Sequence, residues 1–425
     1  MTQEHAPQQV PLEAHVINAA DLPTALPLMK DLLDGTRSLI PLDRPHPSPN
    51  IPALMRAGEL VDAGMLIAST SGSTGTPKGA MLTHENILAS ITATENYARS
   101  EFGAEPGPWL LALPAHHIAG LQVILRSLHA GHEPVVSRHL LSGTSFSGET
   151  FIQDAARLRE LYPDEDLYVS LVPTQLERIL AVEGGLESLT TFAMVLVGGA
   201  AARGTSIDDA RRAGAPIVTT YGSAETAGGA VYNHRPLPGV TLSIDSPDSR
   251  GVGLVVINGP MVSPGYRNAA FGRTFPAEHT FVTSDLGQLD STGELTLLGR
   301  ADGAINTGGY KVLPEEVEKI LWTAFPDAHL ACAVRLESDE FGESIGVALE
   351  LPDAVAGSDP GHVFHTPRGR AFVDITKMVR STLRGSVDRH LIPSRAIALE
   401  NMPTIGPGKV DRMTVKQTMN TITQW

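Results

Sequence analysis

Apolar and polar positions change their period along the chain, and this change predicts regions of different structure. Between residues 65 and 220, short apolar runs alternate with segments in which apolar residues recur every three or four positions. The short runs are typical of buried strands and the longer segments of amphipathic helices. The alternation predicts strand–helix–strand units around a parallel sheet. The expected strands cover residues 65–68, 109–113, 134–136, 167–172, 193–197 and 216–220, and the expected helices cover residues 84–98, 118–130, 150–161, 174–182 and 204–213.

The regions on either side have other patterns. Residues 1–24 are polar and are expected to be frayed at the start, a short helix is expected at residues 25–33, and five prolines between Pro41 and Pro52 predict an extended connector. The expected elements after residue 230 are short strands at 253–257, 280–283, 287–290 and 294–298, then helices at 314–325 and 371–386, and strands at 331–335 and 344–351. The sequence therefore predicts an α/β protein whose parallel layers are followed by a small β subdomain and then an α+β unit.

Length and composition restrict the class of protein. A chain of 425 residues with 42% hydrophobic residues suggests two or three globular domains, and we place the boundary at 300–303. This gives a large N-terminal domain, residues 1–299, and a small C-terminal domain, residues 300–425. The net charge of -15 argues against a nucleic-acid binder.

Cysteine content and apolar runs bear on location. The single cysteine cannot form an internal disulfide, which fits a reducing compartment. The start of the chain lacks the pattern of a signal peptide, and no apolar run reaches the roughly 18 residues that a membrane span requires. We expect a cytoplasmic protein without a transmembrane segment.

The most informative run extends from Ser69 to Gly79 and follows the first expected strand. It is rich in Ser, Thr and Gly and ends in Pro-Lys-Gly. Backbone N–H groups near glycines, hydroxyls and a lysine suit phosphate oxygens. A Walker P-loop would have Ser or Thr directly after the lysine, whereas here Gly79 follows Lys78. The alternative is a flexible Gly/Ser linker, but linkers rarely join a buried strand to a helix.

Five segments, read in order, resemble the adenylate-forming superfamily, which contains acyl-CoA synthetases, non-ribosomal adenylation domains and luciferases. The segments are residues 69–79, 114–120, 221–226, 284–287 with 299–300, and 406–412. The resemblance implies a large domain and a small mobile domain, with ATP and CoA as substrates and Mg²⁺ as the metal ion. It also implies two half-reactions, in which a carboxylate first becomes an acyl-adenylate and a thiol then displaces AMP.

The resemblance assigns the opening run to the β- and γ-phosphates of ATP. The residues concerned are Thr70, Ser71, Gly72, Ser73, Thr74, Gly75 and Lys78. Glu225 matches the carboxylate that holds Mg²⁺, a hard cation that prefers oxygen ligands. The family usually has threonine where Ala224 stands, so one hydroxyl is missing at this position.

Two further groups match the nucleoside contacts of the family. Gly199 and Ala200 would let adenine lie against the backbone, and Tyr221, followed by Gly222, would stack on its other face. The glycines alone would also fit a plain strand-to-helix turn. Asp285 matches the acceptor of both ribose hydroxyls, and Arg300 matches a second ribose or phosphate contact.

The catalytic assignments are His117 and Lys409. His117 matches a histidine between the acyl pocket and the α-phosphate, with a capping or core histidine as the alternative. Ser223 and Thr226 are the other candidates for the acyl pocket. Lys409 matches the lysine that bridges the α-phosphate and the substrate carboxylate, and a solvated C-terminal lysine is its alternative.

The small domain carries the remaining assignments. Asp302 falls at the family's hinge, where a second aspartate is usual and Gly303 stands here. The segment Gly308, Gly309, Tyr310 and Lys311 would form the CoA tunnel. Lys377, Arg380 and Arg384 fall on one face of the expected helix 371–386, which would either be a solvated face or bind the CoA nucleotide.

Residues 114–123, 126–128 and 221–232 look like actinobacterial-type o-succinylbenzoate–CoA ligases of menaquinone synthesis. That acid has two carboxylates, so the one that is not activated must be neutralised or hydrated. Ser223, Thr226 and the helix with Gln122 and Arg126 are the candidates. Another aryl- or acyl-CoA ligase and an enzyme that loads a carrier protein remain alternatives, and the sequence leaves a homodimer open.

Overall fold

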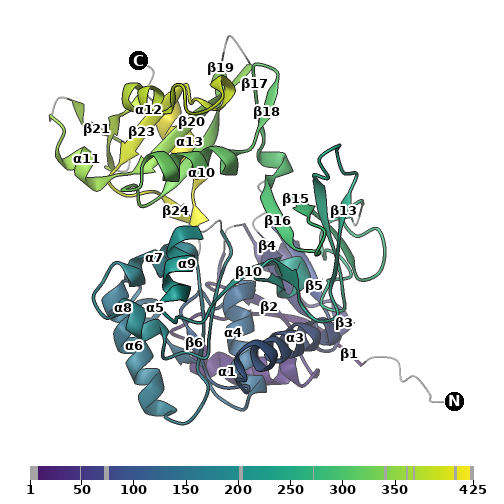
Figure 1. Cartoon of the computed structure of the whole chain (residues 1–425). Coiled ribbons are helices and arrows are strands. Elements are labelled where there is room, and N and C mark those ends of the chain that lie inside the picture. Colours follow the sequence, from purple (N-terminus) through teal and green to yellow (C-terminus); the bar gives the residue numbers. More distant parts are fainter. Residues whose placement is uncertain are drawn as a thin grey trace. The chain divides into compact units, whose positions relative to one another are not determined.

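The computed structural model describes residues 8–47, 49–70, 76–200, 204–270, 272–338, 342–359, 362–366, 369–405 and 409–421. The chain forms two compact units (Figure 1). The large unit contains residues 1–247, 255–283 and 289–296, and the small unit contains residues 248–254, 284–288 and 297–425. From the sequence, we expect the domain boundary directly after residue 299. Two short segments of the preceding β region belong to the small unit by their contacts.

A seven-stranded sheet is the centre of the large unit. Its strands lie in the order β12-β11-β10-β9-β8-β6-β7, and β10, β9, β8, β6 and β7 are parallel. The strands are β6 (Trp109–Leu111), β7 (Val135–Val136), β8 (Tyr168–Leu171), β9 (Met194–Gly198), β10 (Ile217–Ser223), β11 (Gly228–Tyr232) and β12 (Arg235–Pro236). The predicted parallel sheet is therefore confirmed for the strands expected at 109–113, 134–136, 167–172, 193–197 and 216–220, which are present with slightly different ends. The strand expected at 65–68 belongs to a different sheet, which is described below.

Helices cover both faces of this sheet (Figure 1). They are α3 (His84–Phe102), α4 (Ile118–His129), α5 (Arg138–Ser142), α6 (Gly148–Leu161), α7 (Pro173–Leu180), α8 (Gly185–Leu189) and α9 (Gly204–Arg212). Alternate residues of the strands, such as Leu110, Val169 and Val195, form one buried cluster with side chains of α6, α7 and α9. The helix α4 contacts β6, β8 and β11, and α3 contacts β11. Thr83 caps α3 by accepting a hydrogen bond from the Asn86 backbone N–H.

A second, five-stranded sheet lies in the N-terminal part, in the order β3-β1-β2-β4-β5. Its elements are β1 (Gln9–Val16), β2 (Ser38–Leu42), β3 (Leu60–Asp62), β4 (Leu66–Thr70) and β5 (Lys78–Leu82), with the helices α1 (Leu22–Leu33) and α2 (Ile51–Leu54). The frayed start expected within residues 1–24 falls in part on residues 1–7, which lie outside the described residues, but residues 9–16 form β1. The extended proline connector was wrong at its two ends, because Pro41 lies in β2 and Pro52 in α2. β1 pairs with β2 and β3, and the alternate residue Leu12 is buried.

A four-stranded sheet in the order β13-β14-β15-β16 forms the predicted β region. Its strands are β13 (Thr241–Asp245), β14 (Gly253–Asn258), β15 (Thr280–Leu289) and β16 (Leu295–Arg300). The two strands expected at 280–283 and 287–290 are one continuous strand, β15. Its middle part, residues 284–288, belongs to the small unit and carries Asp285.

The small unit is built on a five-stranded sheet in the order β19-β20-β23-β22-β21. Its elements are β17 (Ile305–Thr307), β18 (Tyr310–Val312), α10 (Pro314–Ala324), β19 (Ala331–Ser338), β20 (Gly342–Glu350), α11 (Pro352–Ala356), β21 (Phe364–His365), β22 (Ala371–Asp374), α12 (Thr376–Leu383), β23 (Arg395–Leu399), β24 (Thr404–Ile405), β25 (Lys409–Val410) and α13 (Arg412–Thr421). The helix and strands expected at 314–325, 331–335 and 344–351 are confirmed.

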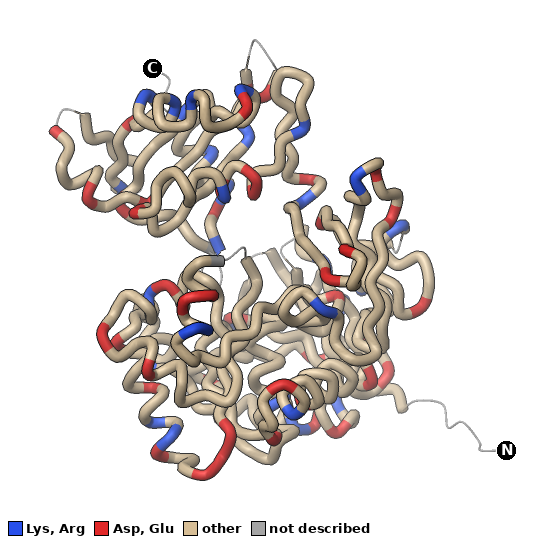
Figure 2. The backbone as a smooth tube through the Cα atoms, viewed as in Figure 1, with Lys and Arg blue, Asp and Glu red and all other residues tan. Residues whose placement is uncertain are grey.

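The helix expected at residues 371–386 was wrong over its first part. Residues 371–374 form β22, which pairs with both β21 and β23. The helix α12 starts only at Thr376, whose backbone N–H donates to the Asp374 side chain. Lys377 and Arg380 therefore lie on a shorter helix, in a segment with several basic positions (Figure 2), and Arg384 ends it.

Acidic and basic side chains are distributed over both units (Figure 2). In the described part of the chain, no helix is long and apolar enough to cross a membrane. The single cysteine, Cys332, is fully buried, and burial raises the pKa of its thiol to about 12.

Candidate active site

The two ends of the Ser/Thr/Gly-rich run lie side by side. β4 and β5 are antiparallel, and Thr70 at the end of β4 pairs with Lys78 at the start of β5. The residues expected to hold phosphate between them, Ser71, Gly72, Ser73, Thr74 and Gly75, lie outside the described residues. The run is therefore held at both ends by one strand pair.

The carboxyl edge of the parallel sheet collects the next group of candidates. His117 follows β6, Gly199 and Ala200 follow β9, and Tyr221 and Gly222 lie on β10. Because parallel strands end at the same edge, this is where open α/β sheets bind ligands. The β10 strand pairs with β9 up to Gly198, so the two strand ends are neighbours.

The turn after β10 places Ser223, Glu225 and Thr226 close together. Thr226 is fully buried, and its hydroxyl lies 2.6 Å from the Gly228 carbonyl and 2.9 Å from the Ser223 N–H. Thr226 therefore holds the hairpin between β10 and β11. The Ser223 hydroxyl is buried and has no hydrogen-bond partner among the described residues, so it is the better placed of the two for a ligand contact.

Glu225 is only 8% exposed, and its carboxylate accepts a hydrogen bond from a buried side chain. The Tyr266 hydroxyl donates to Glu225 Oε1 at 2.7 Å. The Lys78 ammonium lies 5.0 Å from the centre of the Tyr266 ring, which is the geometry of a cation–π contact. The expected phosphate lysine and the expected metal carboxylate are thus connected through one buried tyrosine.

Glu225 suits Mg²⁺ as a single protein ligand. Within the described residues, no group of three or more His, Cys, Asp or Glu side chains could hold a metal ion. Mg²⁺ is commonly held by one or two carboxylates together with substrate phosphates and water. A carboxylate with one oxygen fixed by Tyr266 fits that arrangement.

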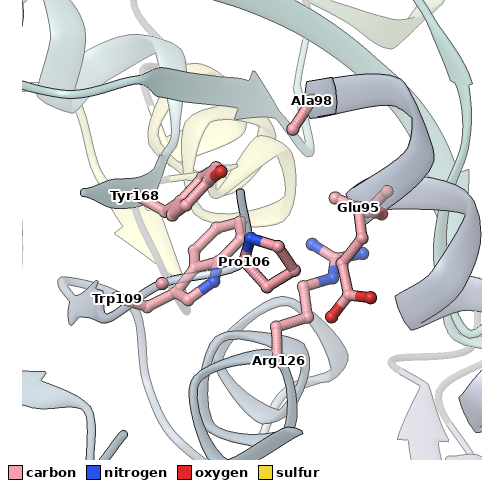
Figure 3. Close-up of a pocket in the computed structure, with 8 residues that line it drawn as sticks. Glu95, Ala98, Pro106, Trp109, Arg126 and Tyr168 are labelled. Carbon is pink, nitrogen blue, oxygen red and sulfur yellow. The ribbon is translucent and has the colours of Figure 1, made fainter. Parts of the chain in front are cut away.

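Arg126, on α4, is the second unusual group in the large unit. It is 4% exposed, and its Nε and Nη2 atoms have no hydrogen-bond partner among the described residues. Its guanidinium lies 5.4 Å from the centre of the Trp109 ring. It lines a cavity of about 10 Å³ together with Glu95 and Tyr168 (Figure 3). A cavity of that size holds about one water molecule.

Gln122, one helical turn before Arg126, is also incompletely paired. Its Nε2 donates to the Ala227 carbonyl at 2.7 Å, but its buried Oε1 has no partner in the described part of the chain. Buried polar atoms normally have partners. The unpaired atoms of Arg126, Gln122 and Ser223 therefore make each of these side chains a candidate for contact with a polar ligand or water.

The two adjacent histidines have different surroundings. His117 is the residue before α4, and its ring centre lies 4.1 Å from that of His116. His116 lines a cavity of about 200 Å³ with Asn18, Asp43 and Leu140. Burial lowers the pKa of His116, and the charge of Asp43 opposes that shift.

The small unit brings four predicted residues together. Arg300 donates to both carboxylate oxygens of Asp302, at 2.9 and 2.8 Å, and its Nη1 lies 3.8 Å from Asp285. Loss of surrounding water lowers the pKa of Lys409, Arg300 lowers it further, and Asp285 opposes both. The ribose candidates, the hinge aspartate and the catalytic lysine candidate are therefore electrostatic neighbours.

An ion pair holds the chain directly after Lys409. Arg412, the first residue of α13, donates through Nη1 to Glu318 Oε1 at 2.6 Å and through Nη2 to Glu318 Oε2 at 3.1 Å. Glu318 lies on α10 and is 3% exposed. Burial raises the pKa of Glu318, and the charge of Arg412 opposes that shift.

Of the expected CoA-tunnel residues, Gly308 and Gly309 form the turn between β17 and β18, and Tyr310 and Lys311 begin β18. Gly308 and Gly309 have positive φ angles of 56° and 84°, which explains why glycine is needed there. Tyr310 is 57% exposed and stacks on His390 with ring centres 4.2 Å apart. Lys311, also exposed, follows it.

Sequence reasoning missed Tyr266, Glu318 and the role of Arg412. Tyr266 occurs in a Pro-Gly-Tyr run whose only sequence signal was its position after a turn. Its contacts are to residues far away in the chain, as are those of Asn268, which bonds to Gly79 over a separation of 189 residues. Such pairings cannot be read from local periodicity.

Comparison with known proteins gives a consistent result. The family model described as AMP-binding enzyme matches residues 59–267. A probable 2-succinylbenzoate–CoA ligase from Mycobacterium tuberculosis is 35% identical over 402 residues, which cover 94% of this chain and 96% of that protein. A 2-succinylbenzoate–CoA ligase from Listeria innocua is 26% identical over 359 residues, covering 82% and 68%.

Solved structures show the same fold. The o-succinylbenzoate CoA synthetase from Bacillus subtilis, in complex with its acyl-adenylate intermediate, has a TM-score of 0.66 and 23% identity, covering 95% of this chain and 83% of that one. An Escherichia coli relative has a TM-score of 0.68 and 23% identity, covering 96% and 88%. The predicted fold class is confirmed, and this chain belongs to the family of AMP-binding, adenylate-forming enzymes.

Proposed function

We propose that this protein is an AMP-forming CoA ligase and that its acid is o-succinylbenzoate. The relative from Mycobacterium tuberculosis supports the proposal because it is similar over nearly the whole of both chains. The observation that carries the choice of acid is the buried, incompletely paired guanidinium of Arg126. A second carboxylate on the substrate would give this charge the partner that it lacks.

The reaction has two balanced steps. A carboxylate oxygen attacks the α-phosphorus of ATP, and pyrophosphate leaves with the electrons of the broken P–O bond. The CoA sulfur then attacks the acyl carbon, AMP leaves, and the thiol proton passes to solvent. Because phosphate charge accumulates in the first step, the site must place cations and N–H donors around it.

The large unit would bind the triphosphate and adenine. Thr70 and Lys78 are fixed at the ends of the phosphate-binding run by the pairing of β4 with β5. Glu225 would hold Mg²⁺, which would neutralise phosphate charge. Tyr221 and the exposed backbone at Gly199 would bind adenine at the carboxyl edge of the sheet.

The small unit would supply the ribose contacts and the lysine. Asp285 would accept hydrogen bonds from the ribose hydroxyls, with Arg300 beside it. Lys409 would bridge the α-phosphate and the reacting carboxylate, and His117 of the large unit would line the acyl pocket. Asp302 would act as the hinge between the half-reactions, and residues 308–311 would guide CoA.

Our choice of acid rests on the two Arg126 nitrogen atoms that have no hydrogen-bond partner among the described residues. Nε and Nη2 form the side edge of the guanidinium, which can donate two parallel hydrogen bonds to a carboxylate. The adjoining cavity of about 10 Å³ holds one water molecule. We therefore infer that the carboxylate that is not activated interacts with Arg126 directly or through that water.

A substrate panel tests the proposal. AMP and pyrophosphate release is measured with o-succinylbenzoate, with the single-carboxylate analogue 4-oxo-4-phenylbutanoate and with indoleacetate, each with and without CoA. We expect o-succinylbenzoate to be strongly preferred. Arg126→Met should raise the KM for o-succinylbenzoate by about 10–100-fold, the value of a lost charge-assisted hydrogen bond, and should affect the analogue little.

The exposed Arg157, changed to methionine, provides the matched control and should leave the KM unchanged. AMP release with none of the acids would contradict the ligase assignment. Equal activity on o-succinylbenzoate and on an acid with one carboxylate would contradict only the choice of acid.

A further inference from the structure

A short segment of the large unit, residues 263–268, connects the phosphate-binding run to the turn that carries Glu225. At one end, the Ser263 N–H donates to the Glu225 carbonyl at 2.8 Å. At the other end, Asn268 donates from Nδ2 to the Pro77 carbonyl at 2.8 Å and accepts from the Gly79 N–H at 3.0 Å. These two bonds to Asn268 hold the backbone on both sides of Lys78.

The backbone between these ends follows β5. The Met81 N–H donates to the Gly265 carbonyl at 2.9 Å, and the Arg267 N–H donates to the Gly79 carbonyl at 2.7 Å. Ala80 and Tyr266 form an antiparallel bridge. The segment therefore has a fixed register against β5, and this register places the Tyr266 side chain.

Tyr266 uses two different parts of its side chain. Its hydroxyl donates to Glu225 Oε1 at 2.7 Å, and its ring face lies 5.0 Å from the Lys78 ammonium. The residue is 7% exposed, and Phe275 packs edge-on against it with ring centres 5.1 Å apart. The ring is thus held by packing, so neither polar contact can be kept if the side chain rotates.

We propose that Tyr266 is a positioning residue that couples the lysine of the phosphate-binding run to the carboxylate that holds the metal ion. The inference rests on the roles proposed above for Lys78 and Glu225. The hydroxyl fixes Glu225 Oε1, so Oε2 is the oxygen that would meet the metal ion. A cation over the ring face also makes the phenol a stronger donor, so each contact strengthens the other.

The two parts of the side chain can be separated by substitution. Tyr266→Phe keeps the ring under Lys78 and removes only the hydroxyl, so it should weaken the metal-dependent part of nucleotide binding. Partners of metal ligands typically change metal affinity by about 10–100-fold. Tyr266→Leu removes the ring as well, so it should also weaken nucleotide binding in the absence of metal.

The test measures binding instead of turnover. The affinity for α,β-methylene-ATP is determined by calorimetry with and without Mg²⁺, and the ratio of the two dissociation constants is compared between variants. Tyr232→Phe is the matched control, because Tyr232 is a buried tyrosine whose hydroxyl contacts Thr94 at 3.0 Å, away from these residues. Thermal denaturation of each variant establishes that it is folded.

The ratio is the dissociation constant without Mg²⁺ divided by that with Mg²⁺, so it measures how much the metal ion strengthens binding. We expect this ratio to fall by about tenfold or more in Tyr266→Phe and to stay at the wild-type value in Tyr232→Phe. An unchanged ratio in Tyr266→Phe would overturn the coupling while leaving the proposed function intact. Wild-type protein that binds the analogue with no gain from Mg²⁺ would overturn both the coupling and the metal role of Glu225.

Discussion

Replacing Arg412 by methionine should destabilise the small unit and slow adenylate formation. The substitution removes two hydrogen bonds to Glu318 and a third, of 2.7 Å, to the Ala333 carbonyl. Among the described residues, the Glu318 carboxylate keeps only the Ala333 N–H as a hydrogen-bond donor, at 2.8 Å. A carboxylate that is 3% exposed is then left without a compensating cation.

The size of the effect follows from the exposure of the two partners. Breaking a buried ion pair by removing one partner costs about 3–5 kcal/mol. The side chain of Arg412 is 42% exposed, however, so water can reach part of the vacated space. We therefore expect a loss of about 2–3 kcal/mol. For a domain of this size each kcal/mol shifts the Tm by roughly 3–5 °C, which gives a decrease of roughly 6–15 °C.

The pH dependence separates this cause from simple loss of packing. Burial raises the pKa of Glu318, and Arg412 opposes that shift, so the variant should raise the pKa further. A folded-state pKa above the unfolded value means that stability is greatest at low pH and falls as pH rises through the folded pKa. The destabilisation should thus be larger at pH 8 than at pH 5.

Thermal denaturation at the two pH values is the assay, with the exposed Arg384→Met as control. The double variant Glu318→Met/Arg412→Met should recover much of the loss, because it leaves no buried charge. Arg412 is three residues from Lys409, so the single variant should also slow pyrophosphate release, by up to about 10²-fold if the lysine moves by 1 Å. A loss that is equal at pH 5 and pH 8 would refute the uncompensated-charge explanation.

Two further predictions concern the predicted site residues. The pKa of Lys409 is lowered, so kcat/KM for adenylate formation should fall at alkaline pH with an apparent pKa below that of an ordinary lysine, and Arg300→Gln should move it upward. A pH–rate profile that is flat to pH 10 would contradict this. Gly222→Ala places a Cβ against the Gly228 carbonyl, so it should destabilise the β10–β11 hairpin by about 1–3 kcal/mol and weaken nucleotide binding, as measured by denaturation and calorimetry.

The parallel sheet and its helices could be predicted because each element carries its own signal. The strand β9 is an apolar run with glycines after it, and α3 begins after a Thr that caps it. The rule that ligands bind at the carboxyl edge then places His117 and Tyr221 at one edge without further information. Local sequence is sufficient wherever local sequence determines the structure.

The secondary-structure predictions were wrong where pairing between distant strands overrides the local pattern of apolar residues. Phe372, Ile375, Val379 and Leu383 have helical spacing, and all four are buried, so the pattern itself was sound. Phe372, however, is buried as part of a strand, because β22 forms backbone hydrogen bonds with both of its neighbouring strands. A helical period that is four apolar residues long cannot distinguish these cases.

Composition predicted which classes of function to exclude but gave no information on how individual charges behave. A net charge of -15 would by itself favour protonated lysines, yet the pKa of Lys409 is lowered. Loss of water and the nearby Arg300 together outweigh the opposing effect of Asp285. The Lys78 ammonium lies against the face of the Tyr266 ring, and the Arg300 guanidinium lies beside the carboxylates of Asp302 and Asp285. Each cation proposed to meet phosphate is therefore controlled by one or two neighbours, and substitutions of those neighbours should be more informative than changes in overall charge.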